Sequence, residues 1–420
     1  MIKALHTSDW HLGAQLYEKD RLDEQRLFLR WLTETIKEEQ IRLLVVSGDI
    51  FDSYVPPAAA QALYYEFLAA MLHLETRPEL VITAGNHDSP QFLNAPREIL
   101  SHLRIHVIPG IDRNVMAVRD EQNNPALAVC AVPFLRERDL GVIAGFAEPS
   151  AQYREAAAAH YRKTVEQARR EMPGIPLLVM GHLFVSGSAL SDDVSERLRE
   201  VGRLSSLPVD ILGEADYHAL GHLHRPQAVN GNERCRYSGS PIPMSFGEAG
   251  QAKSVAIITF DNQNGQHDLS SAASPRIEVR EIPRFSKLEQ IRGDAETIRK
   301  RLEAIQAANE EVYIDIQVTG SAGNIHDFWD ELNVFKAGAL ERRAPFSILA
   351  AQDMREISAG VSTAEIFTEV SSIEPADVFE RKLDEEHIEG PERETYRALF
   401  KEIEARVRSG EALEAEQHED

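Results

Sequence analysis

Five fragments of the chain end in residues of the kinds that bind metals. In each, a short apolar run is followed by Asp, Asn or His, and the last fragment carries two histidines one residue apart. Carboxylate, amide and imidazole groups without a thiolate suit Mn²⁺, Fe²⁺ or Zn²⁺ and disfavour a cysteine-based structural zinc site. The fragments therefore indicate a site for divalent metals. The candidate ligands are Asp9, His11, Asp49, Asn86, His182, His222 and His224.

These seven side chains are too many for one ion, but they suffice for two ions if one carboxylate bridges them. Two ions about 3.5–4 Å apart hold a hydroxide between them and clamp a phosphate for in-line attack. The number and type of the candidate ligands therefore predict the hydrolysis of phosphate esters.

Two neighbouring residues have candidate roles in the same chemistry. His87 follows Asn86, and it can point at the leaving group, where an imidazole acts as a general acid. Asp52 lies three residues after Asp49 and is well placed to orient this imidazole. Capping of a turn is the alternative role for Asp52, and it is the favoured role for Asp88.

Each of these candidate side chains follows a short continuous apolar run, and the structure formed by these runs must position them. Such runs are typical of strands that are buried on both faces, in sheets covered by other layers. In sheets of this kind, ligands bind beyond the carboxyl ends of the strands. Through residue 265, the runs alternate with helical patterns at residues 21–38, 58–74 and 150–171. This alternation predicts an α/β layered domain over residues 1–265.

A second, smaller unit is expected after a polar linker at residues 262–273. Residues 311–318 alternate apolar and polar side chains, which is the pattern of a half-buried strand. Helices are predicted at residues 286–307 and 325–340, and further strands at 277–282 and 346–350. Residues 274–352 are therefore predicted to form a small α+β domain, in which we find no chemical motif.

An acidic tail follows, and we predict a helical region at residues 360–410. One helix carries an apolar stripe at helical spacing, and a second helix precedes it. Two such helices either pack back on the domain or dock on a partner. The stripe consists of Tyr396, Leu399, Phe400, Ile403 and Val407, and the preceding helix is marked by Val378, Phe379 and Leu383.

The net charge of −23 argues against a protein that binds nucleic acid by its own electrostatic attraction. Bound divalent metals would add positive charge where a phosphate must lie. No stretch approaches the roughly 20 apolar residues needed to cross a bilayer, and no signal peptide precedes the first motif. Cys130 and Cys235 lie in apolar contexts typical of reduced core thiols. We therefore expect a cytoplasmic protein that is not bound to a membrane.

The five fragments read D-x-H, G-D-x-x-D, G-N-H-[DE], G-H and G-H-x-H, and in this order they resemble the calcineurin-like metallophosphoesterase superfamily. Residues 6–13, 48–52 and 237–241, together with Ser245 and Phe246, look like the SbcD family of bacterial nuclease subunits. That family is related to the eukaryotic and archaeal double-strand-break repair nucleases. The resemblance covers essentially the whole chain. It implies an α/β metallophosphoesterase sandwich with a small α+β capping domain and C-terminal helices.

The resemblance also implies how two metals, typically Mn²⁺, are bound. Asp49 would touch both ions. By the family pattern, Asp9, His11, Asp49 and His224 hold one ion, and Asp49, Asn86, His182 and His222 hold the other.

The activity implied by the resemblance is that of a nuclease acting with an SbcC-type coiled-coil ATPase, which would bind the C-terminal helices. Members degrade double-stranded DNA 3′→5′ as exonucleases and cut hairpins and single strands as endonucleases, in DNA repair, recombination and replication. They dimerise through helices of the catalytic domain. A homodimer through residues 58–74 is therefore expected, and this segment is rich in apolar residues: Tyr64, Tyr65, Phe67, Leu68, Met71 and Leu72.

Other functions share parts of this pattern. A phosphoprotein phosphatase usually continues its second motif as D-R-G, whereas Ser53 and Tyr54 follow Asp52 here. A secreted nucleotidase needs an export signal, and a small cyclic-nucleotide phosphodiesterase lacks the C-terminal extension. An inactive scaffold is the alternative outside enzymes. Scaffolds of this superfamily have usually lost ligands, and none is lost here.

Overall fold

The computed structural model describes residues 1–112, 114–141, 149–189, 206–261, 275–319 and 325–354, together with Phe379, Arg393, Tyr396, Arg397 and Phe400. Contacts divide the chain into one compact unit at Met1–Gln352 and a second at Asp353–Asp420. The predicted helical region at residues 360–410 thus lies outside the described residues, apart from the five single ones. Among these, the rings of Phe379 and Phe400 stack with their centroids 4.3 Å apart.

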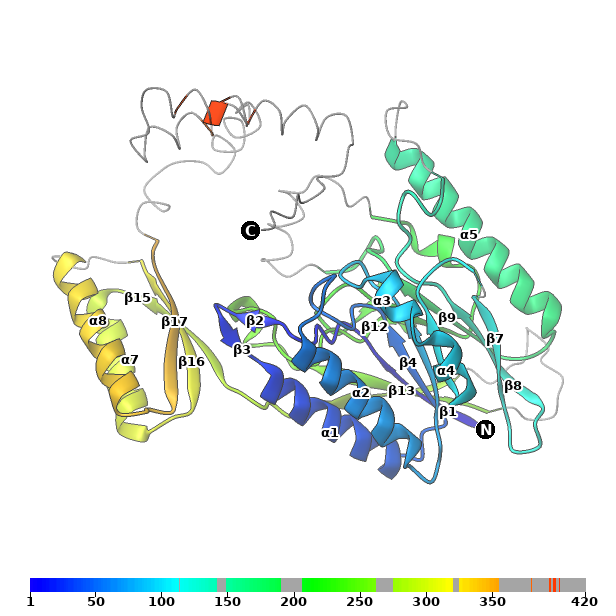
Figure 1. Ribbon diagram of the computed structural model, residues 1–420, viewed down its shortest axis with the longest axis horizontal. Coiled ribbons are helices and arrows are strands. Elements are labelled where there is room, and N and C mark those ends of the chain that lie inside the picture. Colours follow the sequence, from blue (N-terminus) through cyan, green and yellow to red (C-terminus); the bar gives the residue numbers. More distant parts are fainter. Residues whose placement is uncertain are drawn as a thin grey trace, which may run out of the picture. The chain divides into compact units, whose positions relative to one another are not determined.

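Two six-stranded sheets form the centre of the first unit (Figure 1). In the first sheet β1, β4, β5 and β6 run parallel, and β13 and β14 continue the sheet in antiparallel pairing. The order across this sheet is β14 (Arg276–Glu281), β13 (Ser254–Phe260), β1 (Ile2–Thr7), β4 (Leu43–Ser47), β5 (Glu79–Thr83) and β6 (Ile105–Ile108).

The second sheet also contains four parallel strands. Its strands β8, β9, β10 and β12 are parallel, and the edge strands β7 and β11 are antiparallel to their neighbours. The order is β11 (Gln227–Val229), β12 (Asn232–Tyr237), β10 (Tyr217–Gly221), β9 (Leu177–His182), β8 (Pro125–Ala131) and β7 (Val115–Arg119).

The continuous apolar runs arise because both faces of each sheet are buried. In β4, Leu43 and Val45 belong to the core between the sheets, where they meet residues of the second sheet such as Leu178. Leu44 and Val46 belong instead to the core beneath the outer helices. The predicted α/β layered fold is therefore confirmed, because successive residues of one strand enter two different cores.

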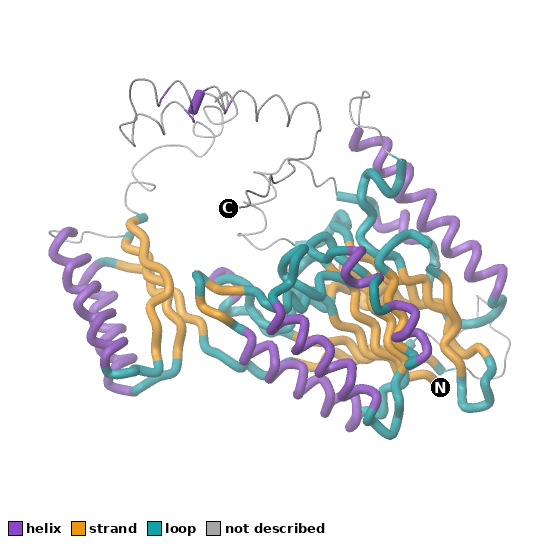
Figure 2. The backbone as a smooth tube through the Cα atoms, in the orientation of Figure 1, coloured by secondary structure: helices purple, strands orange, loops and turns teal. Residues whose placement is uncertain are grey.

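Helices cover the outer faces, as Figure 2 shows. Residues of α1, α2, α3 and α4 pack on the first sheet, and residues of α5 pack on the second. The long helical patterns in the sequence correspond to α1, α2 and α5. The bounds are α1 (Leu22–Glu38), α2 (Ala58–Leu72), α3 (Pro90–Asn94), α4 (Arg97–His102) and α5 (Pro149–Glu171).

A three-stranded sheet follows, with α7 and α8 on one of its faces (Figure 1). The elements are β15 (Leu288–Gly293), α7 (Ala295–Ala308), β16 (Val312–Val318), α8 (Ile325–Glu341) and β17 (Phe346–Asp353). The first predicted strand of this region, β14, instead pairs with β13 in the first sheet.

The helix predicted at residues 286–307 is wrong in its first part. Leu288 and Ile291 have helical spacing, but residues 288–293 pair in parallel with β16 as strand β15. The helix begins only after Asp294, whose side chain accepts a hydrogen bond from the Thr297 N–H at 2.8 Å. This N-cap is a local signal for the start of the helix. The segment before it forms a strand because it pairs with β16, which lies further along the chain.

Short elements complete the described chain: β2 (Gln15–Leu16), β3 (Lys19–Asp20), η1 (Val209–Leu212) and η2 (Phe246–Glu248). Cys130 and Cys235 are both buried free thiols. Within the described ranges, no helix has the length and apolar character required to cross a membrane.

Candidate metal centre

The candidate ligands lie at the carboxyl ends of five parallel strands. Asp9 and His11 follow β1, and Asp49 and Asn86 follow β4 and β5 of the same sheet. The remaining three come from the second sheet: His182 ends β9, and His222 and His224 follow β10. Hydrogen bonds join the two sheets here, since the His222 N–H donates to Asp9 Oδ1 at 2.9 Å and His182 Nδ1 lies 2.8 Å from the Ser47 carbonyl oxygen.

Asp49 lies between two groups of side chains. Its Oδ2 atom is 3.2 Å from His182 Nε2 and 3.7 Å from His11 Nε2. Its other oxygen, Oδ1, accepts a hydrogen bond from the His87 N–H at 2.9 Å. One carboxylate oxygen therefore faces imidazoles from both sheets, as a ligand shared by two ions must.

On one side of Asp49, ligand atoms of Asp9, His11 and His224 all lie within 4.8 Å of one another. His11 is buried, and its ring nitrogen Nε2 has no hydrogen-bond partner. A buried polar atom without a partner is costly. The lone pair of a neutral imidazole nitrogen would be satisfied by a metal ion, so these residues fit a divalent cation.

On the other side, acceptor atoms converge. Asn86 Oδ1 lies 3.1 Å from His182 Nε2 and 3.0 Å from His222 Nδ1. When His182 Nδ1 donates to the Ser47 carbonyl, Nε2 of the neutral ring carries a lone pair. It then faces the oxygens of both Asn86 and Asp49, and three acceptors meeting in this way suit a cation.

The pKa values of His182 and Asp49 also show that positive charge is favoured at this place. Burial lowers the pKa of His182, but the Asp49 carboxylate raises it more, to about 9. For Asp49, burial favours a higher pKa, yet the His182 charge holds it far below its usual range. Asp49 therefore remains a carboxylate, the form that binds metals.

The backbone around the ligands is held in unusual conformations. Asp9, His11, Asp49 and His222 have positive φ values of 52°, 45°, 51° and 102°. Such backbone costs on the order of 1–3 kcal/mol per residue and is concentrated at functional sites. Strain at four candidate ligands indicates that the fold positions them against local preference.

Glycine precedes several ligands because the loops approach one another closely. A Cβ atom on Gly221 would lie 1.8 Å from the Ser47 carbonyl oxygen. On Gly85 it would lie 2.0 Å from Asp49 Oδ1. Any larger residue at these two positions would therefore displace Ser47 or Asp49.

Asp52 and His87 lie beside the first group. The ring nitrogen Nδ1 of His87, an exposed residue, is 2.8 Å from the main-chain oxygen of Asp52. The Asp52 carboxylate lies instead 3.2 Å from His11 Nδ1. Asp52 thus contacts His87 through its backbone and His11 through its side chain, a division that the sequence did not indicate.

Asp88 connects two ligand loops. Its buried carboxylate accepts hydrogen bonds from the N–H groups of Gly85, Ile50 and Phe51 at 2.8, 3.1 and 3.0 Å. Burial and the Asp49 charge raise its pKa to about 6. Asp88 thus caps backbone N–H groups, as the sequence favoured. Its carboxylate caps two loops, however, and not a single turn.

Sequence reasoning missed Glu248 and Lys253. The Oε1 atom of Glu248 lies 3.3 Å from His224 Nδ1, and Oε2 is 2.6 Å from Lys253 Nζ. Burial raises the pKa of Glu248, but the hydrogen bond to His224 and the Lys253 charge lower it more, to about 2. No local pattern marks these residues, because they reach His224 only through the tertiary fold.

Two stacked sheets thus carry Asp, Asn and His at a shared edge, an arrangement that suits metal-assisted hydrolysis of phosphate esters. The family model described as calcineurin-like phosphoesterase matches residues 2–226, and the chain belongs to this family as a hydrolytic enzyme.

Similarity to curated proteins identifies a narrower family within the phosphoesterases. The SbcD subunit of the nuclease SbcCD from Escherichia coli (strain K12) is 33% identical over 407 residues, which cover 95% of this chain and 97% of the relative. The protein of that name in Rhodobacter capsulatus is 37% identical over 287 residues, covering 66% and 68%. The one in Bacillus subtilis is 37% identical over 264 residues, covering 61% and 66%. Within the phosphoesterases, the chain therefore belongs to the SbcD nuclease-subunit family.

Proposed function

We propose that this protein hydrolyses DNA phosphodiesters with two divalent metals, most simply Mn²⁺, bound on either side of Asp49. The position of Asp49 Oδ2, between imidazoles of both sheets, carries the proposal. Asp9, His11 and His224 would complete one site, and Asn86, His182 and His222 the other. When bound, such a pair of ions supplies a nucleophile at neutral pH and neutralises the phosphate.

His87 would protonate the leaving oxygen. Its Nδ1 donates to the Asp52 carbonyl oxygen at 2.8 Å, which leaves Nε2 for the substrate. The ring centroid lies 4.9 Å from that of His11, so the imidazole is close to the first group. An exposed side chain beside a metal site can exchange its proton with solvent between turnovers.

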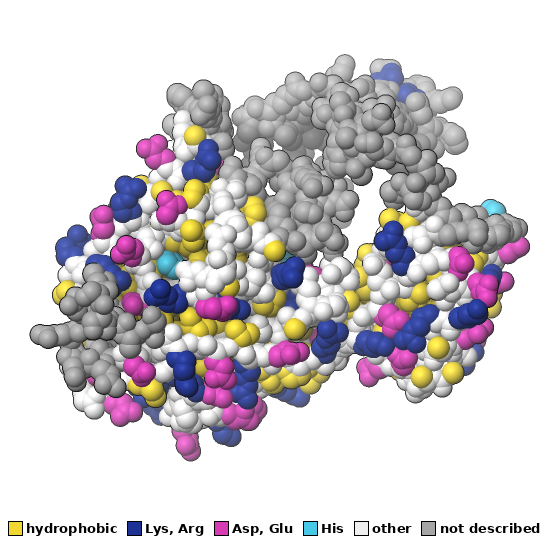
Figure 3. Space-filling model, turned by 180° about the vertical axis from the view of Figure 1, so that it is seen from behind, with side chains coloured by type: hydrophobic (Ala, Val, Ile, Leu, Met, Phe, Trp, Pro, Cys, Tyr) yellow, Lys and Arg dark blue, Asp and Glu magenta, His cyan; other side chains and the backbone are white. Residues whose placement is uncertain are grey.

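The substrates proposed are duplex DNA, degraded 3′→5′, and hairpins and single strands, which would be cut internally. Lys and Arg side chains are interspersed with Asp and Glu on the face shown in Figure 3. A mixed surface offers little general attraction to phosphates. The mixed surface charge therefore favours a complex in which bound metals and a partner protein supply much of the contact with DNA.

We propose an SbcC-type coiled-coil ATPase as that partner, in line with the names of the relatives. The predicted apolar stripe at residues 396–407 would dock in a groove of the partner. The complex would act in DNA repair, recombination and replication.

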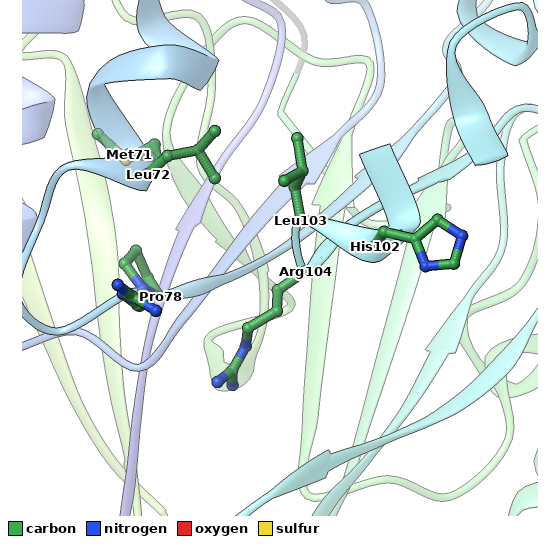
Figure 4. Close-up of a pocket in the computed structure, with 7 residues that line it drawn as sticks. Met71, Leu72, Pro78, His102, Leu103 and Arg104 are labelled. Atoms are coloured by element: carbon green, nitrogen blue, oxygen red, sulfur yellow. The ribbon is translucent and has the colours of Figure 1, made fainter. Parts of the chain in front are cut away.

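A homodimer through α2 and α4 is a further part of the proposal. Tyr65 and Leu72 of α2 are 38% exposed, and Ile99 of α4 is 72% exposed. A cavity of about 240 Å³ adjoins these helices (Figure 4). Leu72 of α2 and Leu103, which follows α4, both line this cavity, and exposed apolar patches are typical of interfaces. The cavity is lined by Met71, Leu72, Arg77, Pro78, His102, Leu103 and Arg104.

The test is a nuclease assay on a hairpin duplex and on linear duplex DNA with Mn²⁺, with and without the partner ATPase. We expect hairpin cleavage that depends on Mn²⁺, and ATP-dependent degradation of long duplex only in the complex. Wild-type protein that binds metal but hydrolyses no phosphodiester would contradict the proposal and favour a purely binding role.

A further inference from the structure

We propose that Glu248 and Lys253 act as a buried pair that positions His224 and thereby sets the affinity for one of the two metals. This inference rests on the proposed function, because it concerns a residue that would bind the ion shared by Asp9, His11 and Asp49. Glu248 and Lys253 are positioning residues, because they would act on the metal through their contacts with His224.

The pair holds His224 at two points. Glu248 Oε1 faces the ring nitrogen Nδ1 at 3.3 Å. Lys253 Nζ donates to the main-chain oxygen of His224 at 2.9 Å. The two charged groups meet each other at 2.6 Å, so ring and backbone are fixed by one connected unit.

The pair is itself held firmly. Glu248 and Lys253 are only 2% and 5% exposed. Glu248 Oε2 accepts the Met244 N–H at 3.0 Å, and Lys253 donates to Ser240 Oγ at 3.0 Å. Buried charges are stable in this way only when they are paired and hydrogen-bonded. Removing one partner would therefore disturb His224.

The turn that carries Glu248 is also anchored from its other side. Phe246 of η2 packs in a small cluster with Leu16 and with Leu288 of β15. The turn therefore contacts the three-stranded sheet through Phe246 and the candidate metal ligand through Glu248.

The tautomer of His224 explains how Glu248 would affect metal binding. A proton on Nδ1, held by the carboxylate, leaves the lone pair on Nε2 for a metal. A carboxylate at Nδ1 also fixes the orientation of the ring. Loss of such a carboxylate commonly costs 10–100-fold in metal affinity. The other candidate histidine of this group, His11, faces Asp52 instead, whose side chain is 39% exposed.

The test measures Mn²⁺ binding to the full, metal-free chain by isothermal titration calorimetry. Glu248→Gln preserves size and removes the charge. We expect the wild type to bind two ions and this variant to bind one of them about 10–100-fold more weakly, with the other unchanged. Activity of the variant should recover when Mn²⁺ is raised by the same factor.

Glu79→Gln is the matched control. Glu79 is also buried and paired, with His106 at 2.9 Å, but it begins strand β5, whereas the candidate ligand Asn86 follows the other end of that strand. It should lose stability without losing metal affinity. Equal affinities in wild type and Glu248→Gln would overturn the inference, as would an equal loss in both variants. A wild type that binds no Mn²⁺ would instead contradict the proposed function itself.

Discussion

Asp49 Oδ2 lies 3.2 Å from His182 Nε2, although the two residues belong to different sheets. The same oxygen is 3.7 Å from His11 Nε2. A single atom thus links the two groups of candidate ligands.

Asp49→Asn should remove binding of both ions and abolish hydrolysis of DNA and of small phosphodiesters. The amide keeps the shape of the carboxylate but removes the charge that both ions need. Elemental analysis and hydrolysis of a chromogenic phosphodiester measure the two effects. His222→Ala, which alters one group only, should also abolish hydrolysis while retaining part of the metal. Normal activity in metal-free Asp49→Asn protein would exclude the two-metal mechanism.

His87→Gln should lower turnover by roughly 10²–10⁴-fold, the usual contribution of a general acid. Metal content should stay at the wild-type level, because His87 contributes only its N–H to Asp49. Metal analysis and steady-state kinetics on one preparation separate these quantities. A loss of metal in proportion to activity would make His87 a ligand instead.

Gly221→Ala should destabilise the protein and disorganise the ligand loops. The new Cβ would lie 1.8 Å from the Ser47 carbonyl oxygen, so the backbone must shift. Overpacking of this kind typically costs about 1–3 kcal/mol, sometimes more. Gly250→Ala is the control, since a Cβ there meets nothing within 4 Å. Urea unfolding of the metal-free proteins compares them, and equal stability would show that the loops relax freely.

Leu72→Asp should convert a homodimer to a monomer. Leu72 is 38% exposed on α2, whereas Leu68 is 3% exposed and belongs to the core, so charging Leu68 would unfold the domain. Val334→Asp, at a 73% exposed position of α8, controls for the added charge. Sedimentation at micromolar concentration gives the mass of each variant. A wild-type monomer would rule out this interface.

Truncation before residue 360 should leave Mn²⁺-dependent cleavage of simple substrates unchanged, because all candidate ligands precede residue 225. It should abolish binding to the partner ATPase and ATP-dependent processing of long duplex DNA. Leu399→Asp combined with Ile403→Asp should have the same effect, since two buried charges cost several kcal/mol. Co-purification of the truncated chain with the ATPase at full stoichiometry would mean that the tail does not form the interface.

The sequence alone determined the strand runs and the residues that end them. Leu43–Ser47 reads as a strand because every residue of it is buried on one face or the other. The polar residue after each run then has to lie at the edge of the sheet. These are local consequences of burial, so they can be read from neighbouring residues.

Tertiary structure alone decided which groups from distant parts of the sequence meet. Glu248 reaches His224, and the Asp52 carboxylate reaches His11 rather than His87. The same holds for residues 288–293, whose helical spacing yields to pairing with β16. The physical reason is that hydrogen bonds and ion pairs between distant segments depend on how strands, loops and sheets pack together, which no short stretch of sequence encodes.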